Sequence, residues 1–413
     1  MSNKNINSFL KIYLYLFLAN ILYNTICNYY GLGFPWNYFL YSPDDRFADF
    51  FKYAAAFPNF KISHELMSIS YVSNYLLDNE YMKDLMIYHT PPFSFFFFTQ
   101  ISYLSNIVNI FYLYFFFMAL LIVGSLYIIN KMIKNKKIII IFLFLYPLVF
   151  AFDRGHILSF LSFYFILLYV FLIYVYQDVK KGLLFLTLAL CIRPNFFPLL
   201  FFIFTIQSIC IKSFFKAVFQ VALYVFSIST FLFFIINMFT DLEYSIINII
   251  QSLDLYHKIM IIEYGGLRYG TSIYLILTKF LSVSEANIIV LFLFFINIFL
   301  LFSKKISQNK SLFLFVIINT IFTISPVNAD YYLILYFIPL IFCLLETNNE
   351  IDNNMNYVLL FLIALLLAPK GYWFSYNSIK YQLSPYLNVA ILVISYFFIF
   401  RYYFLKNKIT SYL

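Results

Sequence analysis

Ile157 to Tyr176 read ILSFLSFYFILLYVFLIYVY, a predominantly apolar run without a charged residue. Because a helix needs about 20 apolar residues to cross the hydrocarbon core of a bilayer, this run predicts a membrane-spanning helix. The whole chain has the same character, since 63% of its 413 residues are hydrophobic and 11% are charged. Soluble domains have roughly 45–50% apolar and 25% charged residues. The composition therefore excludes both a soluble enzyme and a disordered chain.

Further apolar segments flank this run, so we expect an all-α polytopic membrane protein that forms one domain over residues 1–413. The twelve expected segments are 9–27, 104–129, 138–152, 157–176, 183–193, 197–211, 217–239, 286–303, 311–325, 331–345, 357–369 and 387–405. Lysine clusters lie between or beyond them, and every cluster falls on the same side if all twelve segments cross. This positive-inside pattern predicts cytoplasmic termini. It accounts for the net charge of +9 without nucleic-acid binding, and it places all histidines and most acidic residues outside.

The segments 183–193 and 197–211 are predicted to form a short, re-entrant-like hairpin. Lys181 and Lys212 are both expected in the cytoplasm, and each arm between them spans only ~15–20 Å at 1.5 Å per residue. The apex reads Arg193-Pro194-Asn195-Phe196-Phe197-Pro198, and proline ends the first arm. A charge at this depth is unfavourable. Arg193 therefore either reaches lipid head groups by snorkelling or binds a membrane-borne phosphate.

The first outer loop, residues 28–103, is far longer than a connection between two helices requires. It contains Pro43-Asp44-Asp45-Arg46-Phe47-Ala48-Asp49, followed by a helix-favouring stretch from Phe50 to Phe57. An apolar stretch after Pro92 is too short to cross a membrane and suits a re-entrant or interfacial helix. We therefore expect this loop to carry short interfacial helices at the outer membrane surface.

Several short elements occur in an order that is known from one enzyme family. They read Asp49-Phe50-Phe51-Lys52-Tyr53-Ala54-Ala55, Tyr88-His89-Thr90-Pro91-Pro92, Asp153-Arg154-Gly155-His156, Cys191-Ile192-Arg193-Pro194, Gly270-Thr271-Ser272 and Ser325-Pro326-Val327-Asn328-Ala329-Asp330-Tyr331-Tyr332. These resemble the D-x-x-x-Y-x-A-A, Y-P-P, R-G-[QN], L-K-P, G-N-x-S and S-P-x-S-W-D-H-H elements of the polyprenyl-phosphate-dependent mannosyltransferases, glycosyltransferase family 87. The chain departs from the family where Arg193 replaces lysine, Ala329 replaces tryptophan, and Tyr331 and Tyr332 replace histidines.

The resemblance implies a GT-C fold and transfer of a hexose, with mannose expected, from polyprenyl phosphate to a glycolipid or glycan acceptor. The leaving phosphate is a stable anion, so the reaction needs one carboxylate to deprotonate the acceptor hydroxyl and cations to stabilise the phosphate. The resemblance assigns the carboxylate to Asp49. Arg193 and Arg154 are candidate phosphate ligands, because a guanidinium offers paired donors to phosphate oxygens. His156, and Arg268 in a later outer loop, are further candidates for phosphate binding. Asp44 and Asp45, which lie outside the matched elements, are the next candidates for the base. Further substrate contacts are expected from Asp45 and, in the matched elements, from Tyr53, His89, Asp330 and Tyr331.

Most of these residues also fit purely structural roles. Helix capping suits Asp49, Asp330 and His156. A turn suits Asp45 in its Pro-Asp-Asp-Arg string, and Arg154 follows an aspartate with which it can pair.

Arg268 lies in a later outer loop, where surface roles are common. Asp44, Asp45 and Asp49 have the oxygen ligands that suit Mg²⁺ or Mn²⁺. Because the expected donor site is already rich in basic residues, we expect no obligate metal and no cofactor.

Two other functional classes stay open. A transporter or flippase for a lipid-linked substrate also uses broken helices and intramembrane charge, although it would line both membrane sides with polar groups. A non-catalytic assembly subunit would tolerate the loss of Asp49. The expected location is a bacterial inner membrane with the site facing outward, with an endoplasmic reticulum as the alternative. The expected partners are the lipid-linked donor, the acceptor and membrane lipids; the oligomeric state stays open.

Overall fold

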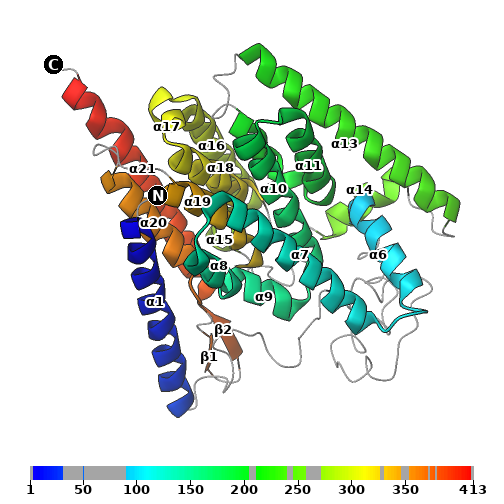
Figure 1. Cartoon of the computed structure of the whole chain (residues 1–413), viewed down its shortest axis with the longest axis horizontal. Helices are drawn as coiled ribbons and strands as arrows, with labels where there is room; N and C mark the ends of the chain where they lie inside the picture. The colour runs from blue at the N-terminus through cyan, green and yellow to red at the C-terminus, as the bar shows by residue number, and fades with distance from the viewer. Residues whose placement is uncertain are drawn as a thin grey trace.

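The computed structural model describes residues 3–30, 50, 90–203, 211–239, 245–256, 271–325, 330–345, 353–370, 373–376 and 379–410. Most of these residues form α-helices or 3-10 helices (η) that lie side by side in a bundle (Figure 1). The elements are α1 (Asn3–Tyr29), α6 (Pro92–Leu104), α7 (Ile110–Ile133), α8 (Lys136–Leu143), α9 (Tyr146–Arg154), α10 (Ile157–Tyr176), α11 (Val179–Ile192), η3 (Pro194–Phe202), α13 (Ile211–Phe239), α14 (Ile246–Tyr256), α15 (Ile273–Phe280), α16 (Val283–Phe302), α17 (Lys304–Gln308), α18 (Lys310–Ile324), η6 (Asp330–Tyr336), α19 (Phe337–Leu345), α20 (Asn353–Leu367), β1 (Trp373–Tyr376), β2 (Ile379–Gln382) and α21 (Ser384–Thr410).

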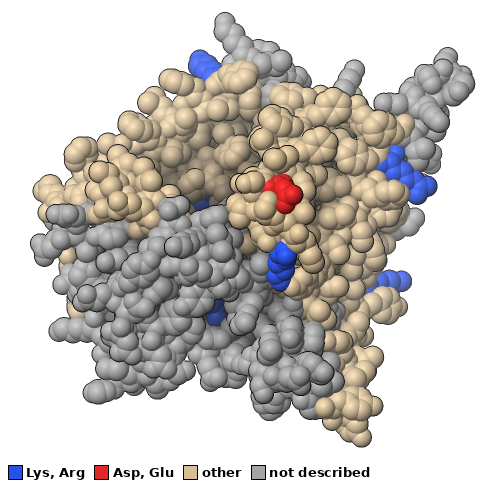
Figure 2. Space-filling view, turned by 180° about the vertical axis from the view of Figure 1, so that it is seen from behind, with Lys and Arg blue, Asp and Glu red and all other residues tan. Residues whose placement is uncertain are grey.

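Within the described residues, six helices are long and apolar enough to cross a membrane. They cover Asn5–Ile26, Ile110–Ile133, Ile157–Tyr176, Ser213–Met238, Val283–Phe302 and Ser384–Phe404. Shorter apolar helices cover Lys310–Ile324, Asp330–Leu345 and Asn354–Leu367. Figure 2 shows one face of the molecule, on which uncharged residues dominate the described surface. The chain is therefore a helical, multi-pass integral membrane protein, which confirms the class predicted from composition.

Proline divides some of the predicted segments into shorter pieces. The predicted segment 138–152 consists of α8, which ends at Leu143, and the separate helix α9. Pro147 lies in the first turn of α9, where its missing N–H is tolerated, but it prevents α8 from continuing. The second arm of the predicted hairpin begins as the 3-10 helix η3, in whose interior Pro198 has no N–H for an α-helical hydrogen bond.

Helix α18 is buried on every side. Each of its residues from Ser311 to Thr323 is buried, and the helix packs against α16, α19 and η3. Its polar Asn319 is satisfied, because it accepts a hydrogen bond from Tyr336 and donates one to Ser395. By contrast, α1 and α13 lie on opposite flanks of the bundle in Figure 1 and expose most of their side chains. Apolar helices exposed in this way are expected to face lipid.

Lysines from several predicted cytoplasmic clusters lie at one end of the bundle, which we call the lysine end. Lys137 at the start of α8 donates a hydrogen bond to Asn7 near the start of α1. Lys310 at the start of α18 lies over the ring of Tyr174 near the end of α10. The last residues of α19 contact both α1 and α10 here. Lys181 belongs to the same end, because α11 begins directly after α10.

A short hairpin lies between α20 and α21 in the otherwise helical described structure. Strands β1 and β2 pair in antiparallel register, with Trp373 opposite Gln382 and Tyr376 opposite Ile379. The two strands are rich in aromatic residues, which favour strands over helices. The hairpin thus connects α20 and α21, the two helices that correspond to the predicted segments 357–369 and 387–405.

Candidate functional site

Segments that are far apart in sequence meet at the end of the bundle opposite the lysines, which we call the site end. They are the α9–α10 junction, the turn between α11 and η3, the start of α15 and the start of η6. Helix η6 packs against both α9 and α10, and α11 leads directly into η3. The site end therefore gathers the described residues 153–156, 191–194, 271–272, 325 and 330–332, which belong to the family-like elements.

Gly155 creates the sharp junction between α9 and α10. Its φ is 74°, in the left-handed region that favours glycine. Its N–H donates to the Phe152 carbonyl, and the His156 N–H donates to the Ala151 carbonyl, which closes the end of α9. This turn places Arg154 at the last position of α9 and His156 at the N-cap of α10. Both side chains therefore lie at the site end.

We predict that Gly155→Ala lowers the free energy of unfolding by about 1–2 kcal/mol, because a Cβ in the left-handed conformation approaches the following carbonyl oxygen. Thermal unfolding of the purified variant in detergent measures this effect. Gly155→Asn is the matched control and should lose less stability, since asparagine tolerates this conformation. An alanine variant as stable as the parent would contradict the role of the turn.

Arg193 ends α11, and its guanidinium lies against His156. The backbone of Arg193 leaves the helical region, with φ −137° and ψ 85°, and Pro194 then begins η3. Nη2 of Arg193 is 3.3 Å from Nε2 of His156. The guanidinium carbon is 5.1 Å from the centroid of the Tyr332 ring, a cation–π contact. His156 is buried and Arg193 is half-buried, so a cation and an imidazole meet at the edge of the apolar bundle.

Ser159 is able to satisfy either neutral tautomer of His156. Its Oγ is 2.7 Å from Nδ1 of the imidazole, and its backbone N–H lies 3.3 Å from the same atom. With the proton on Nδ1, Ser159 Oγ accepts it and Nε2 accepts from Arg193, but the Ser159 backbone N–H then loses Nδ1 as its acceptor. With the proton on Nε2, Ser159 donates to Nδ1, and Nε2–H faces the guanidinium. In this second state an anion placed beside both groups accepts hydrogen bonds from each.

Tyr331 and Tyr332 occupy the positions at which the mannosyltransferase family that the sequence resembles has histidines. The ring centroid of Tyr331 is 4.2 Å from that of His156 and 6.0 Å from that of Phe150. Phe150 in turn stacks on Tyr146 with centroids 5.6 Å apart. The tyrosines therefore hold the imidazole and the guanidinium by packing their rings against them, whereas a histidine would also offer an ionisable group.

Asp330 is the first residue of η6 and is buried, with 1% of its surface exposed. Its Oδ2 accepts a hydrogen bond from the Tyr146 hydroxyl at 3.1 Å. Its Oδ1 accepts from Thr271 Oγ1 at 2.5 Å and from Asn388 Nδ2 at 2.9 Å. These donors come from α9, from the residues before α15 and from α21, so one carboxylate joins three distant parts of the chain.

Lys370 lies just beyond the end of α20 and is buried. Its Nζ donates to the carbonyl oxygens of Leu365, Leu366 and Ala368, at 2.6, 2.7 and 3.2 Å. Carbonyls at a helix C-terminus lack partners within the helix, and a lysine there satisfies them. The same Nζ is 5.9 Å from the centroid of the Tyr146 ring. Burial lowers the pKa of Lys370 to about 7, and the Asp330 carboxylate opposes that fall.

The structure brings several predicted site residues together at the site end: Arg193, His156, Tyr331 and Asp330. Arg154 belongs to the same junction and is half-buried. The other predicted site residues lie outside the described part of the chain, and their roles stay predictions: Asp45, Asp49, Tyr53, His89 and Arg268.

Phe50, which follows Asp49 in the sequence, is described and fully buried. Its ring centroid is 5.0 Å from that of Tyr114 in α7. The Tyr114 hydroxyl donates to the carbonyl oxygen of Phe152 at 2.6 Å, in the last turn of α9. The residue next to Asp49 is thus anchored on the helices that lead to Arg154.

Tyr146, Asn388 and Lys370 belong to the site end but are not among the residues predicted from sequence. Asn388 falls inside the last apolar segment, where a polar residue indicates a buried partner. Lys370 falls on the expected outer side, away from the cytoplasmic lysine clusters. Those two signals could have identified them. Tyr146 is one of 39 tyrosines and carries no signal of its own.

A metal would need several oxygen, nitrogen or sulfur ligands close together. Among the residues that the structure describes, no three His, Cys, Asp or Glu side chains gather in this way. The carboxylates Asp44, Asp45 and Asp49 lie outside those residues.

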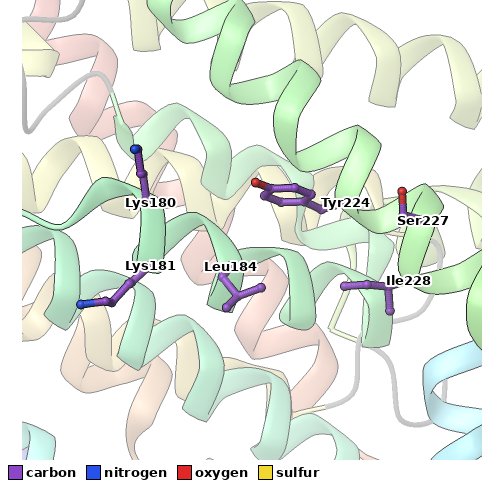
Figure 3. A pocket seen from close by; sticks show the side chains of 6 residues that line it. All are labelled: Lys180, Lys181, Leu184, Tyr224, Ser227 and Ile228. Carbon is purple, nitrogen blue, oxygen red and sulfur yellow. The ribbon is translucent and has the colours of Figure 1, made fainter.

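A surface groove of about 420 Å³ lies between α11 and α13 (Figure 3). Its lining residues are Lys180, Lys181, Leu184, Tyr224, Ser227 and Ile228. The two lysines lie in the first turn of α11, whose opposite end leads to Arg193. The groove therefore belongs to the lysine end, and none of the predicted site residues lines it.

No known family model matches the chain, and neither a curated protein nor a solved structure matches it. Its fold and site define a multi-pass helical membrane protein with an arginine, a histidine and two tyrosines in contact at one end of the bundle. The ligand of this cluster has to be inferred from its chemistry.

Proposed function

We propose that the protein is a membrane-embedded glycosyltransferase of the GT-C type. It transfers a hexose, with mannose as the expected sugar, from polyprenyl phosphate to a glycolipid or glycan acceptor. The observation that supports this proposal is the contact between Arg193 and His156, 3.3 Å apart at the end of an apolar bundle. A phosphate attached to a lipid can reach such a place while its hydrocarbon tail stays in the bilayer.

Arg193 suits a phosphate ligand because the planar guanidinium presents paired N–H donors that match phosphate oxygens. His156 adds a further donor when its proton is on Nε2 and Ser159 donates to Nδ1. Tyr332 covers one face of the guanidinium and limits its hydration there. Arg154, in the same helix junction, supplies a second cation. These groups together would hold the donor phosphate.

In the proposed reaction the acceptor hydroxyl oxygen attacks the anomeric carbon of the donor sugar. The bond between that carbon and the phosphate oxygen breaks, and its electron pair leaves with polyprenyl phosphate. The hydroxyl proton passes to the carboxylate of Asp49, which acts as general base. Arg193 and His156 stabilise the charge that develops on the phosphate. The reaction needs no general acid, because the leaving phosphate is a stable anion.

We further propose that the site end faces outward from a bacterial inner membrane, with twelve crossings and cytoplasmic termini. The lysine end lies opposite the site end, which agrees with the positive-inside rule. In this orientation the donor, the acceptor and the site residues share the outer membrane surface. Labelling a cysteine placed at Lys181 tests it: we expect reaction only from the cytoplasmic side, and labelling from outside would contradict the orientation.

The function is tested by incubating purified protein with a panel of polyprenyl-phosphate hexoses and acceptors from a membrane extract. Mass spectrometry of the products should show one hexose added to a glycolipid or glycan, with the mannose donor favoured. A panel in which no donor loses its sugar would contradict the proposal.

A transporter or flippase for a lipid-linked substrate is the second candidate. The observation that favours it is the burial of both Asp330 and Lys370, since buried ionisable groups are frequent in substrate and proton pathways of membrane proteins. Such a protein would move the donor between leaflets without breaking its bond to the sugar.

A further inference from the structure

Asp330 and Lys370 are buried ionisable residues at the site end that the proposed reaction does not use. Burial of a charge is unfavourable unless hydrogen bonds and an opposite charge compensate it. Asp330 is 1% exposed and Lys370 is 4% exposed. The burial of these two residues in an apolar bundle therefore suggests that they have a structural or functional role.

The hydrogen bonds of both groups are already taken up by the protein. Lys370 has three N–H donors, and the structure gives its Nζ three carbonyl partners at the end of α20. Asp330 accepts from Tyr146, Thr271 and Asn388. Because protein groups take up these polar atoms, a role in holding other residues in place fits both residues better than substrate contact.

Tyr146 connects the two buried charges. Its hydroxyl donates to Asp330 at 3.1 Å, and its ring centroid is 5.9 Å from the Nζ of Lys370. Burial lowers the pKa of Lys370, and the Asp330 carboxylate opposes that fall. Tyr146 therefore contacts two buried ionisable groups, one at the start of η6 and one just beyond the end of α20.

The residues that follow Asp330 reach the phosphate site directly. Tyr331 packs on His156 with ring centroids 4.2 Å apart. Tyr332 lies 5.1 Å from the guanidinium carbon of Arg193. Any shift of Asp330 is thus transmitted through one or two peptide units to the side chains that contact both proposed phosphate ligands.

We infer that Lys370 and Asp330 form a coupled pair of buried groups, bridged by Tyr146 rather than by a direct ion pair, which fixes the start of η6 and thereby positions His156 and Arg193. Lys370 is in this view a positioning residue for a lipid-phosphate site, supplied by a part of the chain far from the family-like elements. The link to phosphate rests on the proposed function; the pairing itself does not.

The first test compares two buried tyrosine hydroxyls. Tyr146→Phe keeps the ring packing but removes the hydrogen bond to Asp330. Tyr396→Phe is the matched control, because its hydroxyl contacts Asn297 and Thr323 elsewhere in the core. Dodecyl phosphate binding is measured well below the melting temperature of each variant. We expect Tyr146→Phe to weaken binding roughly tenfold or more and Tyr396→Phe to leave binding unchanged; equal affinities for both variants would overturn the positioning role.

The second test is a double-mutant cycle on thermal stability, which needs no ligand. Lys370→Met and Asp330→Asn should each lower the melting temperature, because each leaves one charge buried without its partner. The double variant should melt above the Lys370→Met variant, since no buried charge remains. Lys370→Arg keeps the charge and should stay close to the parent. Additive losses in the double variant would overturn the pairing.

The two tests separate failure of this inference from failure of the proposed function. If the parent protein does not bind dodecyl phosphate, the phosphate site is wrong, and the stability cycle still decides whether Lys370 and Asp330 are paired. If the parent binds phosphate and Tyr146→Phe binds it equally well, the positioning role fails while the phosphate site stands.

Discussion

Arg193→Met should weaken the binding of polyprenyl phosphate roughly ten- to a hundredfold. Hydrogen bonds to charged groups contribute about 1.5–3 kcal/mol, and about 1.4 kcal/mol corresponds to a tenfold change in affinity. Methionine keeps a long apolar side chain that can still pack against Tyr332, so the loss should come from the missing donors and charge. Equilibrium binding of a radiolabelled polyprenyl phosphate to protein in nanodiscs measures this effect.

Arg193→Lys should lie between the parent and Arg193→Met, because it keeps the charge but loses the paired donors of the guanidinium. Arg401→Met is the matched control, since Arg401 is exposed on α21, far along that helix from Asn388. We expect parental affinity from the control. Parental affinity from Arg193→Met would remove Arg193 from the phosphate site and leave lipid-head-group snorkelling as its role.

Asp49→Asn should lower the rate of sugar transfer about 10²–10⁴-fold, the usual contribution of a general base. Asparagine keeps the size of aspartate and its ability to cap a helix, but it cannot take the proton of the acceptor hydroxyl. Expression, melting temperature and polyprenyl phosphate affinity should therefore stay close to those of the parent. Single-turnover transfer with a saturating donor measures the rate of the chemical step.

Asp44→Asn provides a matched control in the same outer-loop string and should cost far less turnover. Two results would contradict the assignment of Asp49 in different ways. Near-parental turnover would remove it as the base. Loss of expression or of the folded protein would instead support a capping role, in line with the buried position of the adjacent Phe50.

Hydrophobic segments could be predicted from the sequence because charged and polar residues mark their ends. The expected segment 157–176 coincides with α10, which His156 caps at one end and Gln177 ends in a left-handed conformation. The break between α8 and α9 was harder to predict, because Pro147 stands in an otherwise continuous apolar run. The position of α9, the second half of this run, becomes clear only from its packing against η6.

The candidate site could be predicted only where a residue belongs to a recognisable local pattern. Arg193 follows from its place beside proline at a predicted hairpin apex, and His156 from its place at a helix start after glycine. The contact between these two side chains depends on the packing of α10 with α11, which no local pattern reveals. Lys370 and Asp330 are 40 residues apart in numbering, and their shared neighbour Tyr146 comes from a third region.

The stoichiometry of the reaction in proteoliposomes tests the central claim most directly. Protein is reconstituted with a doubly labelled polyprenyl-phosphate mannose and acceptor lipids, and both labels are followed in the same sample. We predict that each mannose found in a new glycosidic bond is matched by one released polyprenyl phosphate, and that Asp49→Asn forms neither product at a comparable rate. Intact donor recovered in the opposite leaflet, with both labels still joined and no polyprenyl phosphate released, would contradict a transferase and identify a flippase.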